Sequence, residues 1–334
     1  MSGRDGRFAP SPSGALHVGN LRTALLAWLF ARSAGARFLV RVEDLDPGRS
    51  RREHEAGQLA DLAAIGLDWD GPIVRQSERR ELHRAALARL REAGLVYSCW
   101  CTRAEIREAA SAAHGPLREG AYPGTCRHLT TAQRAEREAS GRSPALRLDA
   151  RAAATALGDG HTGDVRITFE DRLDERASAD AADLTIAFED RLHGRVEAAV
   201  DDLVLWRNDD TPAYNLAVVV DDGDQRVGEV VRGDDLLDTT PRQLLIARLL
   251  DLEAPSYAHV PLVLGLDGRR LAKRHGAVTL ADLSEARGWE PADALGWMAA
   301  SLGLAEPGEQ VTPALLEARF SPRRLPREAA TFGG

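Results

Sequence analysis

The chain contains a single lysine, and its position suggests chemistry on a nucleotide. Of the 43 basic residues 42 are arginine, and the exception is Lys273, in the loop from Leu271 to Gly276. A lysine ammonium is a compact charge on a flexible stem, whereas an arginine guanidinium is a planar fork. An ammonium can follow the negative charge that develops across an α-phosphate during nucleotidyl transfer, and a mobile loop can carry it there. We therefore predict that Lys273 binds ATP and takes part in catalysis; the alternative is codon drift that left one lysine on the surface.

A second candidate for nucleotide binding lies near the amino terminus, at His17 to Asn20. A strand predicted at residues 3–9 leads through two prolines and a glycine into an apolar helix predicted from Val18 to Ser33. The start of such a helix binds phosphate through free backbone N–H groups and the helix dipole. His17 can donate to a phosphate, and Gly19, which lacks a Cβ, lets a flat base approach the helix backbone. A histidine in this place is more often a cap, so the four residues alone are a weak signal.

All three cysteines fall within one stretch of 28 residues. Cys99 and Cys101 form a C-x-C pair, and Cys126 follows. In a cytoplasmic protein such a cluster favours zinc over a disulfide. Three thiolates need a fourth ligand, and ligand chemistry alone favours His128 or His114. The alternative is three buried, unligated cysteines.

The elements that would position these residues alternate between strand and helix. This rhythm predicts an α/β fold with a parallel sheet covered on both faces. Strands are predicted at 38–42, 202–206, 227–232 and 259–264, and helices at about 50–65, 78–93, 213–220 and 241–250. We predict four parts: the first half of the catalytic domain at 1–95, an insertion with the cysteines at 96–200, the second half at 201–257, and the lysine loop with a small helical domain at 258–334. Inside the insertion Phe169 to Leu173 recurs as Phe188 to Leu192, and the sequence assigns no function to this repeat.

Composition limits the class of protein. The chain has 334 residues, of which 44% are hydrophobic, enough for a full core. Its net charge of −8 argues against attachment to nucleic acid by bulk charge, although local arginines can still contact phosphates. The first residues include no apolar leader, and the apolar stretch from Ala24 to Ala31 is too short to span a bilayer. We expect a cytoplasmic protein without a membrane segment.

Together these motifs resemble the class I aminoacyl-tRNA synthetases for glutamate, whose two signatures are written HIGH and KMSKS. The first is similar to His17 to Asn20, with asparagine in place of the second histidine, and the second to Leu271 to His275. The resemblance extends over most of the chain, through Ile65 to Pro72, Gln76 to Arg79, Tyr214 to Asp222 and Val231 to Leu236.

The resemblance implies a Rossmann-like parallel sheet with a zinc-containing insertion and a small helical domain at the carboxyl end. It also implies a site for ATP, accompanied by magnesium, at His17, Gly19, Asn20 and Lys273. L-glutamate has two carboxylates and one ammonium, which call for cationic forks and an anion. The family motifs place Arg7, Ser11, Glu43, Tyr214 and Arg232 around it. Which arginine takes which carboxylate stays open, and Glu43 could instead be a structural partner of Arg41.

The length of the chain indicates which member of the family it resembles. Only 59 residues follow His275, too few for the anticodon-binding region of a discriminating glutamyl-tRNA synthetase. The chain resembles the short paralogues that first form glutamyl-adenylate from glutamate and ATP. They then esterify glutamate onto queuosine in the anticodon of tRNA(Asp). Their cysteine pattern continues as Y-x3-C, which implies Tyr122 as the fourth zinc ligand. The alternatives are a truncated enzyme that charges tRNA(Glu), and a catalytically silent RNA-binding paralogue.

Overall fold

The centre of the molecule is one large twisted sheet. The structure, a computed structural model, describes residues 4–112, 122–158, 160–162, 165–171, 182–272, 275–276 and 278–333. The strands follow the order β3-β2-β1-β11-β12-β8-β7-β6, and β9 pairs with β8. The parallel part comprises β1 (Gly6–Phe8), β2 (Phe38–Val42), β3 (Val74–Arg75), β11 (Glu229–Gly233) and β12 (Ser256–Val260). All five residues of β2 are buried, as expected for a parallel strand covered on both faces.

Four strands from the predicted insertion extend this sheet. They are β6 (Gly160–Thr162), β7 (Val165–Asp171), β8 (Ala182–Asp190) and β9 (Gly194–Val200), and they pair with one another in antiparallel fashion. The end of β8 joins β12 in parallel, with Asp190 opposite Tyr257. This junction brings the last residue of β8 beside the parallel part of the sheet.

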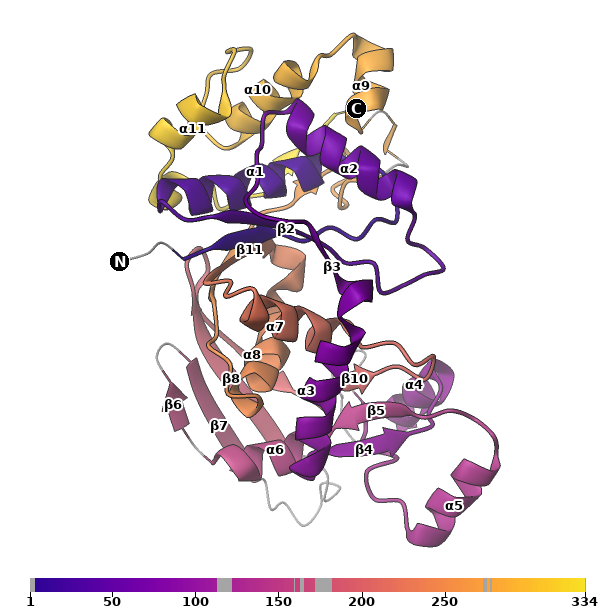
Figure 1. The fold of residues 1–334 in the computed structure, drawn as a ribbon. Helices are drawn as coiled ribbons and strands as arrows, with labels where there is room; N and C mark the ends of the chain where they lie inside the picture. Colours follow the sequence, from indigo (N-terminus) through magenta and orange to yellow (C-terminus); the bar gives the residue numbers. More distant parts are fainter. Residues whose placement is uncertain are drawn as a thin grey trace.

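Helices cover both faces of the parallel strands (Figure 1). On one face lie α1 (Val18–Ser33), α2 (Arg52–Ala64), α9 (Leu280–Arg287), α10 (Pro291–Ser301) and α11 (Pro313–Arg319). On the other lie α3 (Arg80–Glu92), α7 (Tyr214–Asp224) and α8 (Thr240–Leu249). Short 3-10 helices, η1 (Gln76–Arg79), η2 (Asp234–Thr239) and η4 (Pro322–Arg324), complete the layers, and α6 (Ala150–Leu157) packs on β8.

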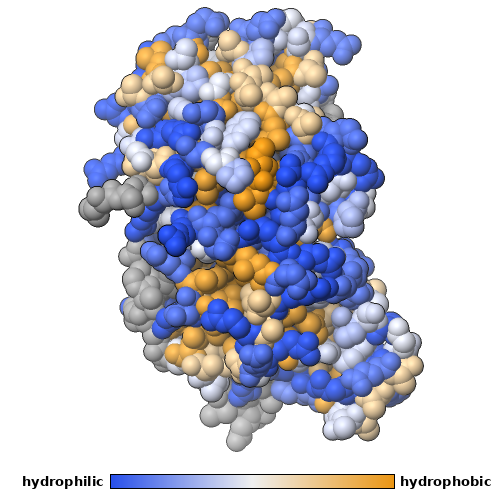
Figure 2. Space-filling view, viewed as in Figure 1, coloured by the Kyte–Doolittle hydropathy of each residue, from blue (hydrophilic) through white to orange (hydrophobic). Residues whose placement is uncertain are grey.

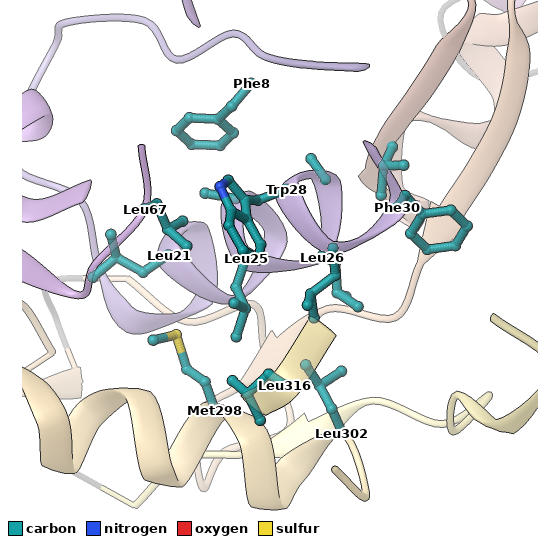
Figure 3. Packing of buried hydrophobic residues seen from close by; sticks show 14 of the residues in the cluster. Phe8, Leu21, Leu25, Leu26, Trp28, Phe30, Leu67, Met298, Leu302 and Leu316 are labelled. Atoms are coloured by element: carbon teal, nitrogen blue, oxygen red, sulfur yellow. The ribbon is translucent and has the colours of Figure 1, made fainter. Parts of the chain in front are cut away.

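Two hydrophobic clusters join the layers. On the α1 face, Leu25 and Leu26 of α1 point toward Met298 of α10, Leu302 directly after α10, and Leu316 of α11 (Figure 3). The helices at the carboxyl end therefore share a core with the first helix. A second cluster fills the space between the sheet and α3, α7 and α8. The surface seen from the same side is mainly hydrophilic, with smaller apolar areas between (Figure 2).

A second, smaller sheet supports the cysteine segment. It contains β4 (Val96–Cys99), β5 (Ala145–Leu148) and β10 (Val204–Trp206), in the order β10-β5-β4. The helices α4 (Arg103–Ala112) and α5 (Thr131–Ala139) follow β4 along the chain and lie at the same end of the molecule (Figure 1). A pair of two-residue strands, β13 (Val263–Leu264) and β14 (Ala330–Thr331), ties the chain end to the loop after β12.

The predicted α/β fold with a parallel sheet is confirmed, and the helix Val18–Ser33 and the strand Phe38–Val42 have the predicted bounds. The single strand predicted at 259–264 is wrong, because β12 ends at Val260 and β13 starts only after Pro261, which has no N–H for a ladder. The four domain limits stay a prediction. In the described part of the chain, no helix combines the length and the apolar character needed to cross a membrane.

Candidate active site

A cavity of about 790 Å³ opens at the carboxyl ends of the parallel strands. Its walls come from the segment between β1 and α1, the end of β2, the start of α7, the turn after β11 and the loop after β12. This edge of a parallel sheet is where α/β proteins bind ligands, because loops and helix N-termini converge there.

Most of the predicted site residues line this cavity. They are Ser11, His17, Gly19, Asn20, Glu43 and Tyr214. Arg7 and Arg232 are not among the lining residues and are buried, with 4% and 5% of their surfaces exposed.

The lysine loop returns to the same cavity. Lys273 itself lies outside the described residues, but the preceding Leu271 and Ala272 line the cavity wall. On the far side of the loop the backbone pairs with the start of α1: the N–H of Val18 donates to the carbonyl of Val278 at 2.9 Å. The two candidate nucleotide motifs, more than 250 residues apart, therefore meet at one cavity.

His17 caps α1 and is held in one tautomer. Its Nδ1 accepts the backbone N–H of Asn20 at 3.1 Å, and the Asn20 Oδ1 accepts the N–H of His17 at 3.2 Å. Since Nδ1 acts as an acceptor, the neutral ring carries its proton on Nε2. Burial, helped by the charge of Arg270, lowers the pKa of His17 to about 4. His17 is therefore a neutral Nε2–H donor near pH 7, and Asn20 is explained as the reciprocal cap.

We expect His17 to stay neutral well below the ordinary histidine range. In the unliganded protein its ring should titrate near pH 4, and its proton should reside on Nε2 above that pH. Between pH 6.5 and about 4 the unfolded chain binds a proton here that the folded chain does not, so this residue lowers stability as the pH falls through that window. Long-range ¹H–¹⁵N correlation spectra of the ring nitrogens measure both properties. A titration near 6.5, or a proton on Nδ1, would contradict this description.

Gly19 leaves room for the His17 ring. A Cβ at this position would lie 3.0 Å from the His17 Nδ1 and 3.2 Å from the Cβ of Val263. Both separations are tighter than ordinary contacts, so a larger residue would displace the imidazole. In the sequence, the missing Cβ of Gly19 indicates access for a flat base. In the structure, the missing Cβ also makes room for the His17 ring.

Glu43 and Arg7 belong to one buried charge network. Arg7 donates through Nε and Nη2 to the two carboxylate oxygens of Asp222, at 3.3 and 3.2 Å. Arg41, fully buried, donates through Nη1 to Asp222 at 2.6 Å and lies 3.5 Å from Glu43 through Nη2. Burial raises the pKa of the Glu43 carboxyl, and Arg41 and Arg7 oppose that rise. Glu43 is thus both a lining residue of the cavity and a structural partner of Arg41.

Asp222 is a member of the site that sequence reasoning did not single out. It is the shared counterion of Arg7 and Arg41, buried on α7. The signal available in the sequence was an acidic pair, Asp221 and Asp222, inside an otherwise apolar helix segment. Such buried carboxylates need charged partners.

Arg232 differs from Arg7 because its partners are neutral. Its Nε donates to the Nε2 of His259 at 3.0 Å and its Nη1 to the Oε1 of Gln243 at 2.8 Å. Its Nη2 donates to the Oγ1 of Thr240 at 2.7 Å and to the carbonyl of Leu236 at 3.4 Å. No carboxylate among the described residues forms an ion pair with it. A buried guanidinium without a counterion favours an anionic ligand.

The three cysteines converge in a second candidate site. Their sulfur atoms lie within 4.8 Å of one another, and those of Cys101 and Cys126 are 3.4 Å apart. The hydroxyl oxygen of Tyr122 lies 3.3 Å from the Cys99 sulfur and 3.7 Å from the Cys101 sulfur. The same oxygen accepts the backbone N–H of Cys126 at 2.8 Å. Three thiols and one phenol oxygen therefore surround a common point.

The two histidines favoured by ligand chemistry are not found in this cluster. His114 lies outside the described residues, and within the described ranges no histidine belongs to the group that the three cysteines form. His128 is therefore not placed as a ligand. The backbone of Tyr122 is fixed by Asp201, which directly follows β9. Asp201 accepts the N–H of Tyr122 at 3.0 Å and forms an ion pair with Arg242 of α8 at 2.8 Å.

Comparison with known proteins gives one consistent family. Residues 5–295 match the family described as tRNA synthetases class I (E and Q), catalytic domain. The chain is 57% identical over 329 residues to the glutamyl-Q tRNA(Asp) synthetase of Nocardia farcinica, covering 98% of this chain and 92% of the relative. It is 48% identical to the protein of the same name from Symbiobacterium thermophilum, covering 97% and 94%.

A solved structure shares the fold. A glutamate tRNA ligase from Elizabethkingia meningosepticum, in complex with its amino acid, superposes with a TM-score of 0.75 at 24% identity. The match covers 99% of this chain and 67% of the ligase chain.

Proposed function

The chain belongs to the class I tRNA synthetases for glutamate and glutamine, and on that basis we propose that it is a ligase that activates L-glutamate with ATP and transfers the glutamyl group to queuosine of tRNA(Asp). The observation that carries the proposal is the meeting of His17 and the flank of the Lys273 loop at one cavity. The chain is 57% and 48% identical, over nearly its full length, to two proteins named glutamyl-Q tRNA(Asp) synthetase. This similarity supports queuosine of tRNA(Asp) as the acceptor of the glutamyl group.

The proposed first step joins glutamate to AMP. The α-carboxylate of glutamate attacks the α-phosphate of ATP, the bond to the β-phosphate oxygen breaks, and pyrophosphate leaves, accompanied by magnesium. We assign to His17 the donation of its Nε2–H to a phosphate oxygen, and to Lys273 the stabilisation of the charge that develops on the phosphates. Gly19 and Asn20 shape the nucleotide side of the cavity. Because no covalent enzyme intermediate is needed, positioning and phosphate charge stabilisation supply the catalysis.

The proposed amino acid site is the part of the cavity lined by Ser11, Glu43 and Tyr214, with Arg7 and Arg232 buried nearby. Glu43 would receive the ammonium of glutamate, and Arg7 and Arg232 the carboxylates. Ser11 and Tyr214 line the cavity and add hydroxyl donors. In the second step a hydroxyl of queuosine attacks the acyl carbon and forms the ester. The bond between that carbon and the phosphate oxygen of the mixed anhydride breaks, AMP leaves with its electron pair, and the hydroxyl proton passes to the departing phosphate or to water.

A direct assay separates this function from its alternatives. The purified chain is incubated with labelled glutamate and ATP, and is offered tRNA(Asp) with and without queuosine beside tRNA(Glu). We expect label only on queuosine-containing tRNA(Asp). Label on tRNA(Glu) would instead favour a truncated glutamyl-tRNA synthetase. A failure to form adenylate at all would favour a silent RNA-binding paralogue.

We also propose that Cys99, Cys101, Tyr122 and Cys126 bind one structural zinc ion. The donor set fits, because thiolates are preferred zinc ligands and four donors complete a tetrahedral structural site. Zinc would crosslink β4 to the segment before α5. The free thiols also suit a reducing compartment, so we place the reaction in the cytoplasm.

Zinc content tests this site. The protein should contain about one zinc ion per chain by elemental analysis. Cys126→Ser should lose the metal and unfold at a temperature several degrees lower, since a ligand and a crosslink are removed. Tyr122→Phe deletes only the phenol oxygen and should weaken zinc binding in competition with a chelator. An unchanged affinity in that variant would exclude Tyr122 as a ligand, and metal-free wild-type protein would exclude the site.

A further inference from the structure

A buried chain of polar groups leads from β8 through β12 to Arg232. The Oδ2 of Asp190 lies 2.7 Å from the Nδ1 of His259, and the Nε2 of His259 lies 3.0 Å from the Nε of Arg232. The register of the sheet creates this contact, because Arg232 of β11 stands directly opposite His259 of β12, and Asp190 opposite Tyr257. Both Asp190 and His259 are almost completely inaccessible to solvent.

Asp190 fixes which nitrogen of His259 carries the proton. The carboxylate also accepts the backbone N–H groups of Leu192 and His193 at 2.9 and 3.0 Å, and that of His259 at 3.1 Å. Burial alone would raise the pKa of Asp190, but the hydrogen bonds from His259 and these backbone groups hold it below its usual value. An ionised carboxylate only accepts, so Nδ1 of His259 must carry the hydrogen.

The tautomer determines what His259 offers to Arg232. With the proton on Nδ1, the Nε2 lone pair accepts the Nε–H of Arg232, and burial lowers the pKa of His259 and so keeps the ring neutral. The ring also lies parallel to that of Tyr257, with centroids 5.9 Å apart and planes at 7°. Of the five N–H bonds of Arg232, one on Nη1 has no acceptor among the described residues.

We propose that Asp190 and His259 are positioning residues, which hold the guanidinium of Arg232 in the orientation that receives a carboxylate of glutamate. This inference rests on the proposed function and deepens it. His259 is a neutral acceptor, so it orients Arg232 without neutralising its charge, and the carboxylate of Asp190 lies on the opposite side of the imidazole. Asp190 belongs to the repeated Phe188 to Leu192 segment, to which the sequence assigned no role.

Asp190→Asn tests the inference with a change of one atom. An asparagine would keep its Oδ1 toward the N–H groups of Leu192 and His193, and its NH₂ would then face the Nδ1 of His259. The imidazole would have to move its proton to Nε2, where it opposes the Nε–H of Arg232. In serine proteases, replacing the aspartate of the catalytic triad by asparagine leaves the geometry intact but gives the histidine the wrong tautomer, and catalysis falls strongly.

The measurement is glutamate-dependent ATP–pyrophosphate exchange. We expect Asp190→Asn to raise the KM for glutamate by about 10- to 100-fold, with the KM for ATP within about twofold of wild type. His259→Gln retains an acceptor for Arg232 and should keep more glutamate affinity than His259→Leu, which retains none. Thermal unfolding monitors the fold of each variant. Ring ¹⁵N shifts should show His259 with its proton on Nδ1 in the wild type and on Nε2 in Asp190→Asn.

Each outcome supports or overturns the inference. A wild-type His259 that is cationic or protonated on Nε2 overturns it without any variant. An active wild type with an unchanged glutamate KM in Asp190→Asn overturns it, as does an equal loss of affinity for glutamate and ATP, which indicates a purely structural role. If the wild-type enzyme shows no exchange with glutamate, the proposed function fails, and the ¹⁵N result still decides the tautomer.

Discussion

Arg232→Met is expected to reduce kcat/KM for glutamate by roughly 30- to 5000-fold, the effect of about 2–5 kcal/mol for losing one partner of a buried charged pair. Methionine is flexible and apolar, so it can occupy much of the space of the arginine stem. The loss should appear because each partner of Arg232 in the described part of the chain is neutral, which leaves its charge for the proposed carboxylate. Steady-state ATP–pyrophosphate exchange at varied glutamate concentration measures it.

Arg195→Met is the matched control. Arg195 lies on β9, is about half exposed and, among the residues that the structure describes, forms an ion pair with the exposed Glu197. This variant should keep the wild-type kcat/KM, since exposed ion pairs contribute little. If Arg232→Met also retained its affinity for glutamate, Arg232 could not be a carboxylate receptor.

Lys273→Arg is expected to lower the rate of adenylate formation by about 100-fold while leaving the fold intact. The charge is conserved, but the planar guanidinium cannot follow the phosphate charge as a compact ammonium does. The structural basis is the cavity wall, where Leu271 and Ala272 adjoin the residues of the His17 motif. The measurement is single-turnover formation of glutamyl-adenylate at saturating ATP and glutamate.

Arg269→Lys provides the converse exchange just before this loop. Arg269 is exposed and does not line the cavity, so this variant should retain wild-type rates. Near-normal adenylate formation in Lys273→Arg would refute the special role of the solitary lysine and would support codon drift as its origin.

The local elements could be predicted because their signals are local. The helix Val18–Ser33 is an apolar run that begins after a turn of prolines and glycine, and the strand Phe38–Val42 is a short apolar run of the kind that parallel sheets bury. The strand predicted at 259–264 is divided in the structure, because Pro261, between β12 and β13, offers no N–H to a ladder.

The role of Asn20 shows the limit of motif comparison. In the sequence it is a departure from a family signature; in the structure it completes a reciprocal cap with His17. The fourth group near the cysteines shows the same kind of limit. Generic ligand chemistry favours a histidine there, but in the structure packing brings the Tyr122 oxygen to the sulfurs.

The sequence by itself determined the kinds of groups present: two candidate nucleotide motifs, a cysteine cluster, and arginines predicted to bind glutamate. Only the tertiary structure decided that Asp222 is shared between Arg7 and Arg41, and that Arg232 contacts neutral groups, with His259 and Asp190 behind it. The physical reason is that charge compensation acts over a few ångströms through space. Those distances are set by strand register and by helix packing between segments far apart in the chain, and residue spacing does not encode them.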